Sequence, residues 1–401
     1  MAKRLGSALV ACAVVLGGGW LAGAGPAAAG EPYVVGYITD LSGPLAESYT
    51  PTWEGFELYV KALNERGGVK GHPIKALIED DRLNAAQAVA KAKKLATENN
   101  VLGIFGLSLS STHGPVYEEM RKAGIPVVTG FSGIADALPP AKDFSYSAGV
   151  VFEVSGEVAG AILPRIGKPG AMVVGMTIDS VGGRALLRHN KPTAEALGFK
   201  WDEVIFPVRT VDFVPYAQAA IAKKPDIVVG HYGAEQNLGV IPALRRQGYT
   251  GPYVVAVYGV SEHVIREAMK RGGSEEGIYQ FNRYATIYDE VPAVKDVKAA
   301  AEKFKTGRPF STMHIQGWVL GKVVAQALEQ CGWPCSREML NGVLASIQVD
   351  TQGLTGGPIK FSPGDHYGTT YWRLSKWNTG KQAFEPVGDW VQQTKPKYLQ
   401  K

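Results

Sequence analysis

Short apolar strands alternate with amphipathic helices along most of the chain, and this rhythm constrains the fold more than any other feature. Before residue 150 we expect strands at 33–38, 74–78, 101–105 and 125–129, and helices at 53–64, 84–98 and 112–123. After it we expect strands at 171–176, 203–207, 227–229 and 253–257, and helices at 183–197, 214–222, 238–247 and 261–271. Such alternation predicts βαβ units and parallel sheets covered on both faces. The fold class is therefore α/β, with two doubly wound domains.

The first 29 residues have the pattern of a secretory signal peptide. Lys3 and Arg4 form a basic start, an apolar stretch follows, and small residues at 27–29 offer a cleavage site after Ala29. A membrane anchor is the other interpretation, but glycines interrupt the stretch, and a lipoprotein-like box ending at Cys12 comes too early. Removing 29 of the 401 residues leaves 372 and lowers the net charge from +5 to +3.

Charge and cysteine usage exclude some classes of function. The small positive charge is dispersed, without a run of five like charges, so we expect no nucleic-acid partner. In an exported compartment, Cys331 and Cys335 are expected to form a local disulfide. A redox or zinc site is the weaker alternative, because the spacing is not Cys-x-x-Cys and no second ligand pair exists.

Motifs for catalysis, cofactors and metals are mostly missing. The turn after the first strand contains no Gly-x-Gly-x-x-Gly, and the chain has no Walker-type phosphate loop. The segment 130–133 resembles a nucleophile elbow, but its spacing fails. The seven histidines show no paired metal-ligand spacing. We expect no cofactor, no metal and no enzymatic activity, since an enzyme would need its catalytic residues dispersed along the chain.

The loops that follow the predicted strands are where a ligand is expected in open α/β sheets. They are rich in glycine, serine, threonine and tyrosine, so they offer backbone N–H groups, neutral hydrogen bonds and flat aromatic walls. These loops are 39–44, 80–82, 106–112 and 130–134 in the first half, and 177–183, 230–235 and 258–261 in the second.

Several of these segments resemble the leucine/isoleucine/valine-binding proteins of ABC importers. The resemblance lies in DLSGPLA (40–46), NERGGVKG (64–71), EDD (79–81), GLSLSST (106–112) and AGIPV (123–127), and it covers nearly the whole mature chain. It implies a type I periplasmic binding protein, with two lobes joined by a three-crossover hinge that closes on ligand. Lobe one would be 30–149 plus 284–365, and lobe two 150–283 plus 366–401. We expect a periplasmic monomer that works with permease subunits.

The resemblance also suggests how a ligand carboxylate is held. In amino-acid-binding members, the serine loop and a hydroxyl after the next strand bind the α-carboxylate. Here the loop serine falls on Ser110, with Ser108 and Ser111 as neighbours, and Ser132 is the nearest later hydroxyl. Helix N-termini behind these loops would favour an anion. The alternative for any one of these serines is that it only caps a helix.

One departure from the family pattern concerns the ligand's amine. Amino-acid-binding members place an acid where this chain has Tyr258, and a buried ammonium without its partner is costly. Glu235 and Asp179 lie near other loops and could substitute only by a different geometry. The resemblance therefore points away from an amino acid.

A second departure concerns the aromatic walls. Two aromatic positions of the family are replaced here by Ser48, beside Tyr49, and by Val181, which enlarges the slot. Rings that could line it instead are Phe131, Tyr232 and Tyr258, with His231 as a further candidate. We therefore expect a hydrophobic, aromatic carboxylate such as a benzoate or cinnamate relative. An aliphatic amino acid or amide, a ligand-sensing role and an exported enzyme are the alternatives.

Overall fold

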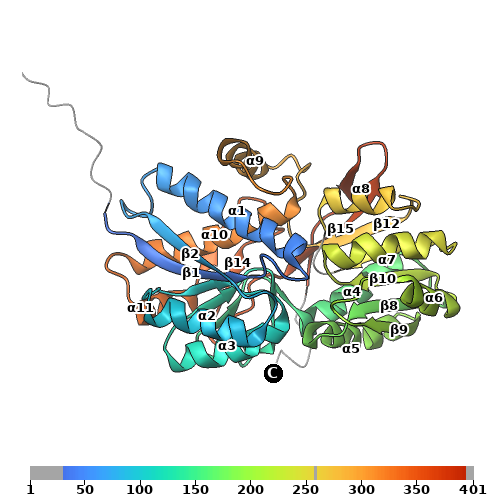
Figure 1. Cartoon of the computed structure of the whole chain (residues 1–401), viewed down its shortest axis with the longest axis horizontal. Coiled ribbons are helices and arrows are strands. Elements are labelled where there is room, and N and C mark those ends of the chain that lie inside the picture. The colour runs from blue at the N-terminus through green and yellow to red at the C-terminus, as the bar shows by residue number, and fades with distance from the viewer. Residues whose placement is uncertain (1–29, 257–259, 394–401) are drawn as a thin grey trace, which may run out of the picture.

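Two α/β lobes lie side by side in the computed structural model, which describes residues 30–256 and 260–393, without the side chains of 155–161 (Figure 1). The predicted signal peptide and Tyr258 lie outside the described residues. Each lobe has a sheet with parallel strands and with helices on its faces, so the predicted fold class is confirmed. The predicted lobe boundaries stay a prediction.

The first lobe contains a five-stranded, fully parallel sheet in the order β2-β1-β3-β4-β6. Alternate residues of its strands face opposite helix layers: Tyr37 packs in the cluster with α1 and α10, whereas Ile38 packs with α2 and α3. The strands are β1 (Tyr33–Thr39), β2 (Ile74–Asp80), β3 (Ile104–Gly106), β4 (Val127–Thr129) and β6 (Ser145–Ser147). The helices are α1 (Ala46–Glu65), α2 (Ala85–Thr97), α3 (Ser110–Lys122), α9 (Pro292–Phe304), α10 (Thr312–Cys331) and α11 (Arg337–Leu344).

The second lobe contains an eight-stranded sheet in the order β16-β15-β12-β11-β10-β8-β9, with β17 paired to β15. Its strands are β8 (Met172–Ile178), β9 (Lys200–Phe206), β10 (Ile227–His231), β11 (Tyr253–Ala256), β12 (Ile278–Asn282), β15 (Tyr371–Asn378), β16 (Ala383–Pro386) and β17 (Val391–Gln392). Its helices are α4 (Phe152–Ile166), α5 (Val181–Ala196), α6 (Val214–Ala222), α7 (Ala234–Arg246) and α8 (Glu262–Lys270). Short elements complete the chain: β5 (Ser132–Gly133), β7 (Val150–Val151), β13 (Gln348–Val349), β14 (Ile359–Lys360) and a 3₁₀ turn (Ala135–Ala137).

Helices α1 and α10 cross at very short range because two glycines meet there. A Cβ on Gly55 would lie 2.0 Å from the carbonyl oxygen of His314, and one on Gly317 would lie 1.9 Å from that of Thr52. Any side chain at either position would therefore push the helices apart. This close crossing joins a segment near residue 55 to one near residue 317 in a single lobe.

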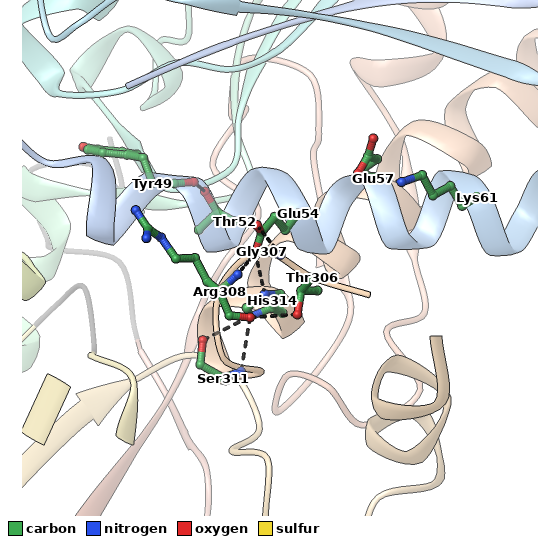
Figure 2. Close-up of polar contacts among 10 residues, drawn as sticks. All are labelled: Tyr49, Thr52, Glu54, Glu57, Lys61, Thr306, Gly307, Arg308, Ser311 and His314. Atoms are coloured by element: carbon green, nitrogen blue, oxygen red, sulfur yellow. Dashed lines mark hydrogen bonds and ion pairs between the residues drawn. The ribbon is translucent and has the colours of Figure 1, made fainter. Parts of the chain in front are cut away.

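The N-terminus of α10 is fixed to α1 by a hydrogen-bond network (Figure 2). His314 Nε2 donates to the Glu54 carboxylate at 3.0 Å, and its Nδ1 accepts the backbone N–H of Ser311 at 3.2 Å. Glu54 also accepts the backbone N–H groups of Gly307 and Arg308, at 2.9 and 3.2 Å. Ser311, His314 and Glu54 resemble a catalytic triad in composition, but Ser311 and His314 form a buried capping box.

Apolar residues of the first lobe pack directly into the core of the second. Leu45, Tyr49, Leu109, Phe131 and Met313 belong to the buried cluster that the second sheet and its helices form. The two lobes are thus in contact where the loops after their strands meet.

Two details of the sequence prediction can be compared here. Helix α1 begins at Ala46, not near residue 53, so Ser48 and Tyr49 lie on a helix and not in a loop. The helix therefore begins before Pro51 and contains this proline, whereas the predicted helix began after it. The disulfide between Cys331 and Cys335 is present, as predicted.

Candidate functional site

The strand order places a topological switch point in each lobe. In the first sheet β1 lies between β2 and β3, and in the second β8 and β10 are neighbours while β9 lies outside β8. Ligands of open α/β sheets bind beyond the carboxyl ends of strands at such points. The candidate site therefore comprises the loops after β1, β3, β8 and β10.

Two of the predicted serines form hydrogen bonds inside the first lobe. The Ser108 hydroxyl donates to Asp81 Oδ2 at 2.5 Å, and the Ser132 hydroxyl donates to the Ser108 carbonyl at 3.2 Å. The same carbonyl contacts His113 Nε2 at 3.1 Å. Burial raises the pKa of Asp81 to about 6, and burial lowers the pKa of His113 to about 4, so this imidazole is neutral and Nε2–H is the donor. Ser108 and Ser132 thus hold the serine loop in shape.

Ser110 forms a hydrogen bond across the lobes. It is the first residue of α3, and its buried hydroxyl oxygen accepts the backbone N–H of Gly182 at 3.0 Å. Gly182 lies in the first turn of α5, where Ser180 caps the N–H of Gly183 at 3.0 Å. The N-termini of α3 and α5 therefore face each other at Ser110. Both helix dipoles make this point favourable for negative charge.

Ser48 and Glu235 form a second contact between the lobes. The Ser48 backbone N–H donates to Glu235 Oε1 at 3.0 Å, and its hydroxyl donates to Oε2 at 2.8 Å. The Ser48 oxygen also accepts the N–H of Ala234 at 2.8 Å and so caps α7 from the other lobe. Burial, chiefly, and the nearby carboxylate of Glu47 raise the pKa of Glu235 to about 7. Ser48 therefore links the two lobes by hydrogen bonds.

An aromatic pair and a buried cation lie beside the serine loop. The rings of Tyr49 and Phe131 have centroids 4.5 Å apart, and both side chains are buried. The Arg283 guanidinium, 1% exposed, donates to the Phe131 carbonyl at 3.4 Å and lies 5.4 Å from the ring of Trp372. Arg283 follows β12 directly, and the sequence prediction did not include it.

The other predicted residues that the structure describes are not brought into this group. Tyr232 points into the second lobe, where its hydroxyl pairs with that of Tyr253 at 2.7 Å. His231 is buried against Asn190, with its Nε2 at 2.5 Å from the amide nitrogen, and burial lowers its pKa to about 3. The side chains of Val181 and Ser111 are exposed.

Three carboxylates of the first lobe lie close enough together to hold a metal ion. Oxygens of Asp40, Asp80 and Asp81 lie within 4.8 Å of one another, the one such group among the described residues. Their oxygens already accept hydrogen bonds from loop donors, namely the N–H groups of Leu41, Gly43, Leu45, Arg82 and Leu83 and the hydroxyls of Ser42 and Ser108. The three aspartates thus order the loops after β1, β2 and β3.

Sequence reasoning also missed a buried acid in the second lobe. Glu262 is the first residue of α8 and is 2% exposed. Burial raises its pKa to about 7, and the Thr312 hydroxyl and Arg266 moderate the rise. Thr312 begins α10 of the first lobe, so Glu262 also lies between the lobes. Its place after the capping residue Ser261 was the available signal.

The arrangement can be compared with known proteins. The periplasmic binding protein family model matches residues 32–382. The chain belongs to this family. Family members bind substrates for ABC transporters outside the cytoplasm, and they are not enzymes as a class. Among the described residues, the helices are too short or too polar to cross a membrane.

Individual relatives agree with this assignment. A Leu/Ile/Val-binding protein homolog 7 from Brucella suis is 25% identical over 326 residues, covering 77% of this chain and 79% of the relative. A branched chain amino acid ABC transporter protein from Thermus thermophilus, with bound valine, superimposes with a TM-score of 0.80 at 18% identity, over 90% and 97% of the two chains. A solute binding protein from R. palustris, in complex with 4-hydroxybenzoate, gives 0.74 at 19% identity, over 92% and 99%. The structural matches show a common fold.

Proposed function

We propose that this chain, exported by its signal peptide, captures a small hydrophobic carboxylate between its lobes and delivers it to an ABC importer. The preferred ligand is aromatic, a benzoate or cinnamate relative. The observation that carries the proposal is the position of the Tyr49 and Phe131 rings, 4.5 Å apart, beside the loop that leads into α3, whose first residue Ser110 binds the other lobe. Flat apolar walls and anion-favouring groups therefore lie next to each other.

Three features support an anionic ligand group. The N-termini of α3 and α5 meet at Ser110, and each carries a partial positive charge. Backbone N–H groups at such termini bind carboxylates readily. The guanidinium of Arg283 adds a full positive charge next to the Phe131 carbonyl, in a place with little water to screen it.

Branched-chain amino acids are the second candidate. Glu262 favours them, because a buried carboxylate between the lobes is a suitable partner for an ammonium group. The valine bound by the Thermus thermophilus protein and the name of the Brucella suis relative are consistent with this candidate.

A thermal-shift screen separates the two candidates, since a ligand that binds only the folded state raises its melting temperature. The mature chain, residues 30–401, is tested with benzoate, 4-hydroxybenzoate, cinnamate, leucine and valine. We expect the aromatic acids to raise the melting temperature and the amino acids to leave it unchanged. If leucine or valine raised the melting temperature and the aromatic acids did not, the proposed aromatic ligand would be wrong.

A further inference from the structure

Buried side-chain atoms without a hydrogen-bond partner occur in both lobes of the described chain, and four of the residues that carry them lie on α8, α10 and β12, where the lobes meet. These four contribute both carboxylate oxygens of Glu262, the Thr312 hydroxyl, the Gln316 side-chain oxygen and the Gln280 side-chain nitrogen. Each of these side chains is at most 2% exposed. An unsatisfied buried polar group costs about 1–3 kcal/mol, so native proteins keep few of them. Unpaired polar atoms from elements of both lobes are therefore candidates for binding a polar group of a ligand.

These side chains form a continuous line that leads to the aromatic pair. The Thr312 hydroxyl faces the Glu262 carboxylate closely enough to lower its pKa, although the contact lacks hydrogen-bond geometry. Thr312 and Gln316 are one helical turn apart and so share a face of α10. Gln316 Nε2 donates to the Gly130 carbonyl at 2.9 Å, next to Phe131.

The two helices that carry this line, α10 and α8, are held in place. The capping box of Ser311 and His314, bound to Glu54, fixes the first turn of α10 and with it Thr312 (Figure 2). On the other side, the backbone N–H of Val260, two residues before Glu262, donates to Gln280 Oε1 at 3.2 Å. The acceptor groups are therefore preorganised and need not pay ordering entropy when a donor binds.

The Glu262 carboxylate and the Gln316 side-chain oxygen are hydrogen-bond acceptors, whereas the Gln280 side-chain nitrogen is a donor and the Thr312 hydroxyl can act as either. Burial, chiefly, raises the pKa of Glu262 to about 7, while its own backbone N–H, the positive charge of Arg266 on the same helix and the Thr312 hydroxyl act in the opposite direction. Arg266 itself donates to the Gln382 carbonyl at 3.1 Å. A carboxylate so placed gains most from a hydrogen-bond donor that arrives with the ligand.

We propose that Glu262, Thr312 and Gln316 form a second subsite that accepts a hydrogen bond from the ligand, which therefore carries a hydroxyl or a protonated amine in addition to its carboxylate. This inference rests on the proposed function. It makes Glu262 a specificity-determining residue, since a ligand without the donor would leave the buried acid unsatisfied.

Calorimetric titration of two matched ligand pairs tests the subsite. The hydroxyl pair is 4-hydroxybenzoate and benzoate, and the amine pair is leucine and 4-methylpentanoate. We expect the wild-type chain to prefer the donor-bearing member of one pair at least tenfold. In Glu262→Gln the preference should fall below threefold, mainly through weaker binding of that member. Glu267→Gln, on the exposed side of the same helix, should keep it.

The outcomes decide the inference separately from the proposed function. An undiminished preference in Glu262→Gln, or no preference in either wild-type pair, overturns the subsite. Should Glu262→Gln not fold, as judged by circular dichroism, Thr312→Val takes its place, with an expected loss of about threefold in preference. If no carboxylate binds the wild-type chain, the proposed function fails. The comparison is then made with two uncharged pairs, 4-hydroxybenzamide with benzamide and leucinamide with 4-methylpentanamide. If neither pair shows a preference that depends on Glu262, the subsite is overturned as well.

Discussion

Replacement of Glu235 by glutamine tests whether the lobes are in contact in the native chain. The pKa of this partly buried acid is raised from an ordinary value of 4.5 to about 7, mainly by loss of solvation. The folded chain therefore holds the proton more tightly than the unfolded chain does. The resulting stability is fully present below pH 4.5 and is lost as the pH rises through 7. Relative to the fully protonated state at low pH, the titration of Glu235 thus lowers the free energy of unfolding by about 3 kcal/mol at pH 8 and by about 1 kcal/mol at pH 5.

Glu235→Gln removes this dependence on pH. It also removes one acceptor for the Ser48 hydroxyl, at a cost of about 1 kcal/mol at every pH. The variant should therefore be more stable than the wild type by about 2 kcal/mol at pH 8 and about equal to it at pH 5. Urea unfolding at both pH values measures the difference, with Glu302→Gln on the exposed face of α9 as the control. A difference that does not change with pH would mean that Glu235 is solvated and that its contact with Ser48 is absent.

Two further substitutions, each with a matched control, test other contacts. Ser110→Ala leaves the Gly182 N–H without its partner across the lobes, which should weaken ligand binding by about 1–2 kcal/mol, or roughly 5- to 30-fold in Kd. The control is Ser111→Ala at the exposed neighbouring position, which should leave the titration curve unchanged. Equal Kd values for the two variants would remove Ser110 from the site. Gly317→Ala forces a methyl group against the backbone of α1 and should lower stability by about 1–3 kcal/mol or more in urea unfolding. Gly342→Ala in α11 meets no atom within 4 Å and should instead raise stability by about 0.5–1 kcal/mol, so a stabilised Gly317→Ala would refute the close crossing.

The regular part of the fold was predictable because parallel strands buried on both faces appear as apolar runs. The predicted strand 33–38 corresponds to β1 (Tyr33–Thr39), and the predicted helix 183–197 corresponds to α5 (Val181–Ala196). The signals that end these elements, such as Gly198 after α5, act over a few residues and are visible in the sequence.

No strand or helix was predicted in the segment 272–350, for two physical reasons. Strand β12 contains Gln280 and Asn282 at buried positions, so it lacks the apolar run by which a buried strand is recognised. Helix α10 is buried on nearly all sides, which removes the contrast between an apolar and a polar face that marks an amphipathic helix.

The sequence predicted which loops form the candidate site, but it did not predict the contacts between their residues. The serine loop lies at the predicted strand ends, but the contact from Ser48 to Glu235 joins residues 187 positions apart. No local pattern indicates such a pairing. Glu262 was missed because an acid in the first turn of a helix usually only complements the helix dipole, at the surface. Its burial follows from the approach of α10, which comes from the other lobe.

Calorimetric titration of the purified mature chain with 4-hydroxybenzoate and with leucine tests the central claim most directly. The account predicts saturable one-to-one binding of the aromatic acid with a Kd in the micromolar range or below, and no heat of binding from leucine. Tight binding of leucine together with no binding of the aromatic acid would contradict it.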